Sequence, residues 1–416
     1  MIGKQLGYSE SLPPSWKVKT VGDIGSYING FPFKPTQWGS EGLPIIRIQN
    51  LNDRNKPFNY YDGEVPERYR IRDGDILISW SASLGTYRWN RGDAWLNQHI
   101  FKATPNQKEL SNEFFYWVMV HGIDRIAGNA RGSTMKHVTG KEFGNSQIAI
   151  PPLPEQKKIA HILSTVQRAI EAQERIIQTT TELKKALMHK LFTEGLRQEP
   201  QKQTEIGPVP ESWEVRKLGG IAKTISKGSS PKWQGFQYTE SGILFVRSQN
   251  VGSGKMLLDD RAYLPASFNE KEKRSILKSG DILINLVGAS IGRVALGTEE
   301  IEGGNCNQAV GFVRLKGSDS LKQLIVYFLL SPWGQEQMRR QKKDIARANL
   351  SLLDVRGFQI PIPSTDEEIE EAARALVTLE EKVATHERKR AQLQDLFRTL
   401  LHELMTAKTR VYELAV

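Results

Sequence analysis

The sequence contains very little cysteine and no long apolar run. Cys306 is the only cysteine among 416 residues, which excludes both an intrachain disulfide and a cysteine-based zinc cluster. No stretch of about 18 apolar residues is present, so no transmembrane helix is indicated. Residues 1–10 lack the apolar core of a signal peptide, and we therefore expect a cytoplasmic protein.

Motifs that indicate catalysis are also missing. Residues 252–255 read Gly-Ser-Gly-Lys, but Gln249 and Met256 stand where a phosphate-binding loop requires Gly and Ser or Thr. No Asn-Pro-Pro-aromatic or Asp-Pro-Pro-aromatic tetrapeptide, a motif of amino-methyltransferases, is present, and no G-x-G-x-x-G stands between a strand and a helix. None of the histidines form a close metal-ligand pair: His99, His121, His137, His161, His189, His386 and His402. We therefore expect no metal site, no bound cofactor and no catalysis by this chain alone.

The composition that remains is that of a basic globular protein. Hydrophobic residues make up 39% and charged residues 25% of the chain, which is enough apolar material for packed cores. The net charge is +10 and the sequence pI is about 9.4. Such a charge favours contact with a polyanion, and nucleic acid is the leading candidate.

The sequence contains an internal duplication. Leu12 to Ile24 returns as Val209 to Ile221, each containing a Ser-Trp pair, and further short strings follow in the same order. The offset between the copies grows from 197 to 213 along the chain, because the second copy carries small insertions. A period this long indicates a duplicated domain rather than a solenoid.

Each copy begins with a mixed segment of short strands. Residues 44–48, 76–80 and 243–246 are β-branched or aromatic runs bounded by turn residues, which predicts strands. A Gly-Asp pair precedes the central strand of each copy, at Asp75 and at Asp281. An aspartate in a turn before an apolar strand is typical of a structural role.

Each copy ends in a long helix. The first is expected from Pro154, which suits the first helical turn, and the second from Ser364 or Thr365, each of which fits a capping box. Heptad spacing links Val166, Gln173, Thr180 and Leu187 with Ala169, Ile176 and Leu183, and in the second helix it links Leu379, His386, Leu393 and Leu400.

Neither helix can bury such a stripe alone, so each helix is the obvious partner of the other. If a two-fold axis relates the copies, the two helices lie antiparallel. We expect an α+β fold: two duplicated mixed α/β domains joined by two long antiparallel coiled-coil helices, with pseudo-two-fold symmetry. The expected boundaries are 1–153, 154–195, 196–363 and 364–410.

The basic excess lies outside these helices. Residues 154–193 carry seven Lys and Arg against four Asp and Glu, and residues 364–410 carry eight against ten. About nine of the ten net positive charges therefore belong to the rest of the chain. That distribution predicts phosphate contact by the globular domains and protein packing by the helices.

The order of these parts resembles the specificity subunit of a type I restriction–modification system. Residues 204–215 (Thr-Glu-Ile-Gly-Pro-Val-Pro-Glu-Ser-Trp-Glu-Val) are similar to the opening of a target recognition domain in that family. Residues 151–160 are similar to the start of its first spacer helix, and residues 280–283 to its central strand. The first copy departs from the opening motif at residues 7–11, and the second helix lacks the Pro-Glu-Gln start.

The resemblance implies a DNA-reading subunit. Each recognition domain would read one half of a split target in double-stranded DNA, and the coiled coil would fix the spacer between the halves. The coiled coil would also dock two methyltransferase subunits, which bring S-adenosylmethionine. Motor–nuclease subunits would add ATP- and Mg-dependent translocation and cleavage.

The duplication separates two groups of candidate DNA-binding residues. The two copies are expected to read different half-sites, so residues shared by both copies cannot alone explain specificity. We expect shared residues to be scaffold or phosphate contacts: Arg47 and Arg247, Gln49 and Gln249, Asn50 and Asn250, Ser83 and Ser290, and Gln98 and Gln308.

Residues that read bases should be polar or aromatic, lie in loops and differ between the copies. Arg or Lys can pair with guanine, and Asn or Gln with adenine, in the major groove. In the first copy the candidates are Trp80, Ser81, Tyr87, Arg88, His99, Arg131, Thr134 and Lys136. In the second copy they are Lys232, Trp233, Asn285, Asn305, Arg347 and Asn349.

The helices supply candidate partner-binding residues: Val166, Ile170, Ile176, Ile177, Leu183, Leu187, Leu379, Val383, Leu393, Leu396 and Leu400.

Two other interpretations of the function stay open at this point. One is a specificity subunit of a related split restriction or defence system, and the other is a coiled-coil scaffold without a role on DNA.

Overall fold

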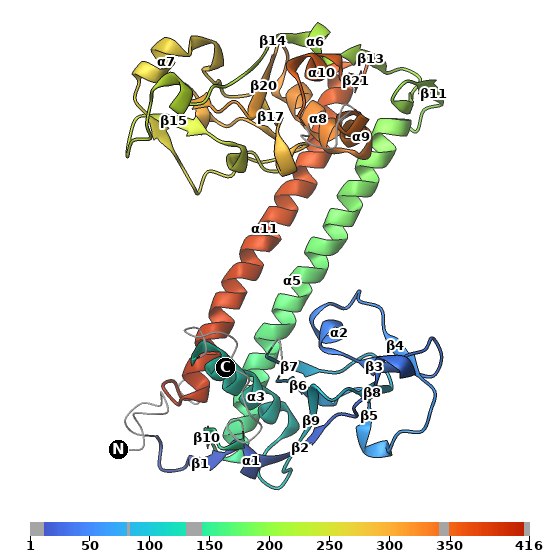
Figure 1. The fold of residues 1–416 in the computed structure, drawn as a ribbon, viewed down its shortest axis with the longest axis vertical. Helices are drawn as coiled ribbons and strands as arrows, with labels where there is room; N and C mark the ends of the chain where they lie inside the picture. Colours follow the sequence, from blue (N-terminus) through green and yellow to red (C-terminus); the bar gives the residue numbers. More distant parts are fainter. Residues whose placement is uncertain (1–11, 81–83, 130–143, 341–348, 412–416) are drawn as a thin grey trace. The chain divides into compact units, whose positions relative to one another are not determined.

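The computed structural model describes residues 12–80, 84–129, 144–340 and 349–411. The chain forms two compact units, one of Met1–Glu174 with Arg388–Val416 and one of Arg175–Glu387. Both units combine short strands with helices, and each contains part of both long helices (Figure 1). The expected α+β fold, with duplicated mixed domains and two long helices, is confirmed.

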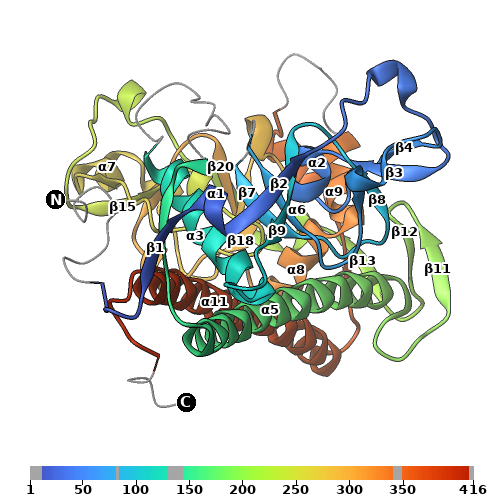
Figure 2. The ribbon, with the colours of Figure 1, turned by 90° about the horizontal axis from the view of Figure 1, so that it is seen from below.

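The first unit contains two four-stranded sheets, ordered β2-β9-β6-β7 and β4-β3-β8-β5, and a separate antiparallel pair, β1 with β10 (Figures 1 and 2). Its elements before the long helix are β1 (Lys17–Thr20), α1 (Val21–Ile24), β2 (Gly25–Asn29), η2 (Pro35–Gln37), β3 (Leu43–Ile46), α2 (Ile48–Asn52), β4 (Asn59–Tyr61), η3 (Glu67–Tyr69), β5 (Arg70–Ile71), β6 (Ile76–Ser79), β7 (Gly85–Arg88), β8 (Ala94–Leu96), β9 (Ile100–Pro105), α3 (Asn112–Asn129) and β10 (Gln147–Ile150).

The second unit contains the sheets β14-β20-β17-β18 and β16-β15-β19, and the pairs β13 with β21 and β11 with β12. Its elements between the long helices are β11 (Gln201–Thr204), β12 (Gly207–Pro210), β13 (Glu214–Lys217), α6 (Leu218–Ile221), β14 (Ala222–Lys227), η4 (Lys232–Gln234), β15 (Ile243–Val246), η5 (Ser248–Asn250), β16 (Tyr263–Leu264), α7 (Ser267–Lys271), η6 (Lys273–Ser275), β17 (Ile282–Asn285), η7 (Gly288–Ser290), β18 (Val294–Leu296), η8 (Glu299–Ile301), β19 (Asn305–Cys306), β20 (Val310–Leu315), α8 (Asp319–Leu330), α9 (Pro332–Arg340), α10 (Leu352–Gly357) and β21 (Gln359–Ile362).

The two units repeat one topology. The sheet β2-β9-β6-β7 corresponds to β14-β20-β17-β18, and the parallel pairing of β3 with β8 corresponds to that of β15 with β19. The strands expected at 44–48, 76–80 and 243–246 are present as β3, β6 and β15. The duplication predicted from the sequence is therefore confirmed at the level of strand order.

The long helices lie close to their expected positions. Helix α5 is Leu153–Glu194 and helix α11 is Asp366–Met405, so α11 ends five residues before the expected boundary at residue 410. Forty residues of α-helix extend about 60 Å. At the start of α11 the Thr365 hydroxyl accepts a hydrogen bond from the Glu368 backbone at 3.3 Å, as expected for an N-cap. The Glu368 carboxylate does not complete a capping box and instead accepts a hydrogen bond from the Trp213 indole.

That tryptophan is part of a repeated contact. The Trp16 indole donates to Glu155 at 3.0 Å, and the Trp213 indole donates to Glu368 at 3.0 Å. The tryptophan of the Ser-Trp pair that occurs in both copies thus anchors each unit to the first turn of a long helix. In the first unit Arg410 adds two further hydrogen bonds to Glu155, at 2.8 and 3.0 Å.

The repeated turn aspartates have the structural role expected for them. Asp281 is 1% exposed and receives two hydrogen bonds from Arg314, at 2.8 and 2.7 Å. In the first unit Asp75 pairs with Lys102 at 2.7 Å. Each aspartate also accepts a hydrogen bond from the backbone three residues earlier, which closes the turn before the central strand.

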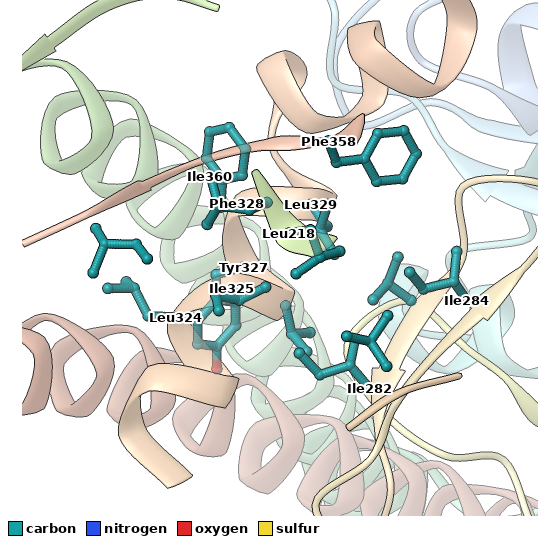
Figure 3. Packing of buried hydrophobic residues seen from close by; sticks show 14 of the residues in the cluster. Leu218, Ile282, Ile284, Leu324, Ile325, Tyr327, Phe328, Leu329, Phe358 and Ile360 are labelled. Atoms are coloured by element: carbon teal, nitrogen blue, oxygen red, sulfur yellow. The ribbon is translucent and has the colours of Figure 1, made fainter. Parts of the chain in front are cut away.

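The main core of the second unit lies between its four-stranded sheet and the helices. Figure 3 shows Ile282 and Ile284 of β17 and Leu324, Tyr327 and Phe328 of α8 as members of one buried cluster. These five side chains are at most 1% exposed, and full burial of such side chains stabilises a fold by about 1.5–3 kcal/mol each. The same cluster includes residues from the end of α5 and the start of α11, namely Met188, Leu191, Phe192, Ile369, Ala372 and Leu376.

The helices run antiparallel within each unit. In the second unit Lys184 of α5 pairs with Glu380 of α11 at 2.8 Å, while positions later in α5 share a core with earlier positions in α11. In the first unit Trp117 donates to Ser164 of α5 at 3.1 Å, and its ring centroid lies 5.4 Å from that of Phe397 in α11.

The heptad assignment in α5 is correct for one row and wrong for Leu183. Gln173 and Thr180 are buried as expected, and so is Ile170, which was expected to widen the stripe, but Leu183 is 55% exposed. The buried stripe of a straight helix drifts relative to a strict seven-residue repeat, because the helix has 3.6 residues per turn. Leu183 therefore lies beside the buried stripe rather than in it.

Candidate nucleic-acid interface

Four segments of the second unit meet at one edge of its four-stranded sheet. The Ser229 backbone after β14 donates to the Cys306 carbonyl at 3.2 Å. The Leu286 backbone after β17 donates to the Ala309 carbonyl at 2.8 Å, and Leu350 in turn donates to the Leu286 carbonyl at 2.8 Å. The segments after β14, after β17, between β19 and β20, and at residues 349–350 therefore form one surface.

A glycine makes this close approach possible in both units. A Cβ on Gly228 would lie 1.7 Å from the Cys306 carbonyl oxygen, and a Cβ on Gly30 would lie 2.2 Å from that of Asn97. Any side chain at either position would push the two loops apart. The first unit thus builds the same loop edge as the second.

The first unit brings three sequence-predicted residues together at this edge. The ring of Trp80 lies 6.1 Å from that of His99 and stacks on Phe101 at 5.7 Å. The Gln98 amide nitrogen lies 3.4 Å from His99 Nε2. His99 is exposed, and Trp80 and Gln98 are half-buried.

Apart from Gln308, which corresponds to Gln98, the second unit places different side chains at its edge. Lys232 and Trp233 follow the loop after β14, Gln308 lies between β19 and β20, and Asn349 pairs with Val287 in an isolated bridge. Lys232, Trp233 and Asn349 are exposed, and Gln308 is half-buried. The two edges have the same backbone construction but display different chemistry.

The shared asparagines have a structural role. Asn50 and Asn250 are each 2% exposed, and each holds the following loop by donating to two backbone carbonyls at 2.8–3.1 Å. Each side-chain oxygen also accepts the backbone N–H of the preceding Arg47 or Arg247. The scaffold alternative expected for this shared pair fits these contacts.

The shared arginines are also held by the protein. Arg47 lies over Trp38 at 4.4 Å and donates to Asn59 at 3.2 Å. Arg247 pairs with Asp260 at 2.9 Å. Hydrogen bonds from Gln249 and Arg247 lower the pKa of the Asp260 carboxyl below its ordinary value. Gln49 is exposed on α2.

Two predicted base-reading residues are not where we expected them. Asn285 and Asn305 are both 0% exposed. Asn285 donates to the Ser248 carbonyl at 2.8 Å, and Asn305 donates to Asn269 at 2.8 Å. The expectation that these amides face outward from loops is wrong, because both residues lie on buried strands and hold neighbouring loops in place.

Tyr87 is half-buried and Arg88 is exposed. Both form hydrogen bonds with residues other than Trp80 and His99. The Tyr87 hydroxyl donates to Asn52 at 2.6 Å. Arg88 donates twice to Glu113, at 2.6 and 3.0 Å. Ser290 of the shared serine pair donates to the Val287 carbonyl at 3.4 Å. The remaining predicted residues lie outside the described part of the chain: Ser81, Ser83, Arg131, Thr134, Lys136 and Arg347.

The two loop-edge glycines were not predicted from the sequence. Gly30 and Gly228 each stand directly after a strand and shortly before a proline, at Pro32 and Pro231. That shared order was a usable signal, because a glycine between a strand and a proline indicates a constrained turn.

The long helices carry a second candidate surface. Leu183 of α5 is 55% exposed and Leu396 of α11 is 46% exposed. The two leucines occupy equivalent positions in the two copies, because Leu396 follows Leu183 by 213 residues, the offset that relates the ends of the copies. Ile170 is 5% exposed and belongs to the buried stripe. The other candidate partner-binding positions are half-buried: Val166, Ile176, Ile177, Leu187, Leu379, Val383, Leu393 and Leu400.

Within the described residues, no cluster of three His, Cys, Asp or Glu side chains is arranged to hold a metal ion. In the same part of the chain, no helix is both long and apolar enough to cross a membrane.

The chain therefore consists of two duplicated domains that present different side chains on one loop framework. A family model described as the type I restriction modification DNA specificity domain matches residues 13–181 and again residues 210–395. Because these matches cover most of the sequence, the chain belongs to this family.

Full-length relatives agree with the family match. The type I restriction enzyme MjaVIII specificity subunit of Methanocaldococcus jannaschii is 27% identical, over 97% of this chain and 95% of its own length. The EcoBI specificity subunit of Escherichia coli is 27% identical, over 89% of this chain and 80% of its own length. The crystal structure of a type I restriction–modification S subunit from M. genitalium has the same fold, with a TM-score of 0.62 at 17% identity over 96% of this chain and 98% of that one.

The relatives are named specificity subunits. The expectation of a type I restriction–modification DNA-specificity subunit is therefore confirmed.

Proposed function

We propose that each unit reads one half of a bipartite DNA target through the loop edge described above. The observation that supports this proposal is the pairing of a repeated scaffold with unlike exposed residues. Asn50 and Asn250 hold equivalent loops in the same way, whereas the exposed side chains at the two edges differ. One framework can then recognise two half-sites of different sequence.

The side chains at the edges suit base recognition. In the first unit Gln98 and His99 supply hydrogen-bonding groups beside the Trp80 ring. In the second unit Lys232 can contact guanine or phosphate, and Asn349 can pair with adenine in the major groove. The +9 charge outside the helices supports the phosphate contacts that every such complex needs.

We further propose that α5 and α11 fix the spacer between the half-sites. Deleting one heptad from each helix removes about 10 Å of helix, which corresponds to about three base pairs of B-DNA. The half-sites themselves should not change.

Leu183 and Leu396 support a proposal for the partners. Equivalent exposed leucines on the two helices would let two copies of one protein dock in the same way, and we propose two methyltransferase subunits that carry S-adenosylmethionine. Motor–nuclease subunits with ATP and Mg would complete the complex, with this chain binding no cofactor itself. Such an assembly acts on cellular DNA, and we therefore propose a cytoplasmic location.

The function is tested by co-expressing the chain with the methyltransferase encoded beside it and sequencing the methylated sites. We expect a bipartite motif, and the heptad-deletion variant should shorten its spacer by about three base pairs while leaving both half-sites intact. A continuous motif, or an unchanged spacer in a folded variant, would contradict the proposal.

The docking surface is tested separately by native mass spectrometry of the purified complex. Leu183→Asp and Leu396→Asp should each lose one methyltransferase copy, because each places a charge in an apolar contact. Leu257→Asp is the matched control, since Leu257 is 37% exposed and lies off the helices. Retention of both copies by the two helix variants would refute the docking assignment.

A further inference from the structure

Trp233 is the most exposed large hydrophobic side chain in the described residues, at 79%. It sits on the three-residue helix η4 (Lys232–Gln234), and the described part of the chain gives its indole no hydrogen bond and no ring partner. Resting on the proposed DNA-reading function, we propose that Trp233 is an aromatic wedge that inserts between two stacked base pairs of the half-site read by the second unit.

The backbone that carries Trp233 is held rigidly on both sides. Pro231 is buried, and its carbonyl accepts the Phe236 backbone N–H at 2.9 Å. The Phe236 ring packs edge-on against Phe268 at 5.2 Å. Lys271 donates to the Gln234 carbonyl at 3.0 Å. The loop is therefore folded before any ligand arrives, and the indole points outward at little conformational cost on binding.

The wedge is continuous with the proposed DNA surface. The loop that leads to η4 starts at Gly228 and Ser229, whose backbone N–H groups donate to the Val310 and Cys306 carbonyls, each at 3.2 Å. The same turn, between β19 and β20, carries Gln308. Beside the indole, the exposed Lys232 supplies a cation for a phosphate next to the unstacked step.

The first unit lacks an equivalent wedge. Its short helix η2 is followed by Trp38, but that ring lies beneath the Arg47 guanidinium at 4.4 Å and packs against a cluster around Phe33 and Trp95. The first unit therefore shelters its tryptophan and the second unit exposes one. We expect the deformation of the DNA to be confined to the half-site read by the second unit.

A wedge would add specificity without a base contact. An apolar side chain inserted between base pairs unstacks them and kinks the duplex by about 20–90°. Pyrimidine–purine steps deform most easily. The half-site read by the second unit should therefore favour such a step at a fixed position, even where no polar side chain reaches the bases.

The test uses the full chain in complex with its co-expressed methyltransferase and duplexes carrying 2-aminopurine at single positions. Purines other than the methylated base are replaced one at a time, because the methylated base must leave the stack for chemistry. Binding should raise the fluorescence at one step in one half-site only. Trp233→Ala should abolish that rise and lower affinity about 5- to 150-fold, whereas Trp233→Phe should retain part of both effects.

Tyr238→Ala is the matched control, because Tyr238 is a second exposed aromatic of the same unit, at 56%, and its ring contacts Phe245 at 6.0 Å. This variant should behave as the unmodified complex. A fluorescence rise that persists in Trp233→Ala, or no rise in the unmodified complex bound to its target, would overturn the wedge. Failure of the unmodified complex to bind any bipartite duplex would instead refute the proposed function.

Discussion

The contact between Arg410 and Glu155 gives a sharp prediction about the stability of the first unit. The Arg410 and Glu155 side chains are only 15% and 10% exposed, and Glu155 also accepts the Trp16 indole. Arg410→Ala leaves the Glu155 carboxylate buried with one neutral donor. Removing one partner of a buried pair costs about 3–5 kcal/mol, and we expect about 3 kcal/mol here because the pair keeps some solvent contact.

The assay is calorimetric unfolding of the full chain, combined with a double-mutant cycle. For a unit of this size, 3 kcal/mol should lower the melting temperature of its transition by about 6–12 °C. Glu155→Gln keeps an acceptor for Trp16 but removes the charge, so Arg410→Ala should cost much less in that background. Hydrogen exchange of peptides that contain Trp16 should rise in parallel.

The first copy offers a matched control. Arg197 stands at the position equivalent to Arg410, is exposed, and makes no ion pair within the described residues. Arg197→Ala should therefore leave the melting temperature nearly unchanged. The reasoning is refuted if Arg410→Ala and Arg197→Ala shift it equally, or if Arg410→Ala and Glu155→Gln are fully additive.

Three further predictions concern the second unit. Gly228→Ala should weaken binding to one half-site and lower the melting temperature, because the new Cβ would lie 1.7 Å from the Cys306 carbonyl oxygen. Gly220→Ala is the control: a Cβ there meets nothing within 4 Å, so neither binding nor melting should change. Asp281→Ala should destabilise the chain by about 3 kcal/mol in urea unfolding, since it leaves the Arg314 charge without its partner, and an unchanged midpoint would contradict this. Burial raises the pKa of the Cys306 thiol far above its ordinary value, so alkylation at pH 8 should require unfolding, and rapid labelling of the native chain would show the thiol to be accessible.

The sequence predicted the elements that repeat. Ser-Trp pairs, Gly-Asp turns and heptads located the domains and helices because each reflects a local rule that holds in both copies. The strands at residues 76–79 and 243–246 followed from β-branched runs bounded by turns. The predicted position of α5 was within one residue at each end.

The candidate site was harder to predict because burial is a tertiary property. Asn285 and Asn305 are polar and differ from their counterparts, which made them suitable candidates, but both are inside the unit and hold neighbouring loops. Leu183 was misassigned because a strict heptad drifts from a 3.6-residue helix. Only the structure separated Trp233, which is exposed, from Trp38, which an arginine covers.

The division of the chain into units has a consequence for synthesis. The second unit is one continuous segment, Arg175–Glu387, but the first unit needs Arg388–Val416 as well as Met1–Glu174. The ribosome delivers the end of the chain roughly 240 residues after Glu174, which takes about 10–50 s at ordinary elongation rates. During that interval Trp16 and Trp117 lack their α11 and C-terminal neighbours Phe397 and Arg410. The domain made first is therefore the domain completed last, and the nascent amino-terminal half is the part of this protein most exposed to chaperones and proteases.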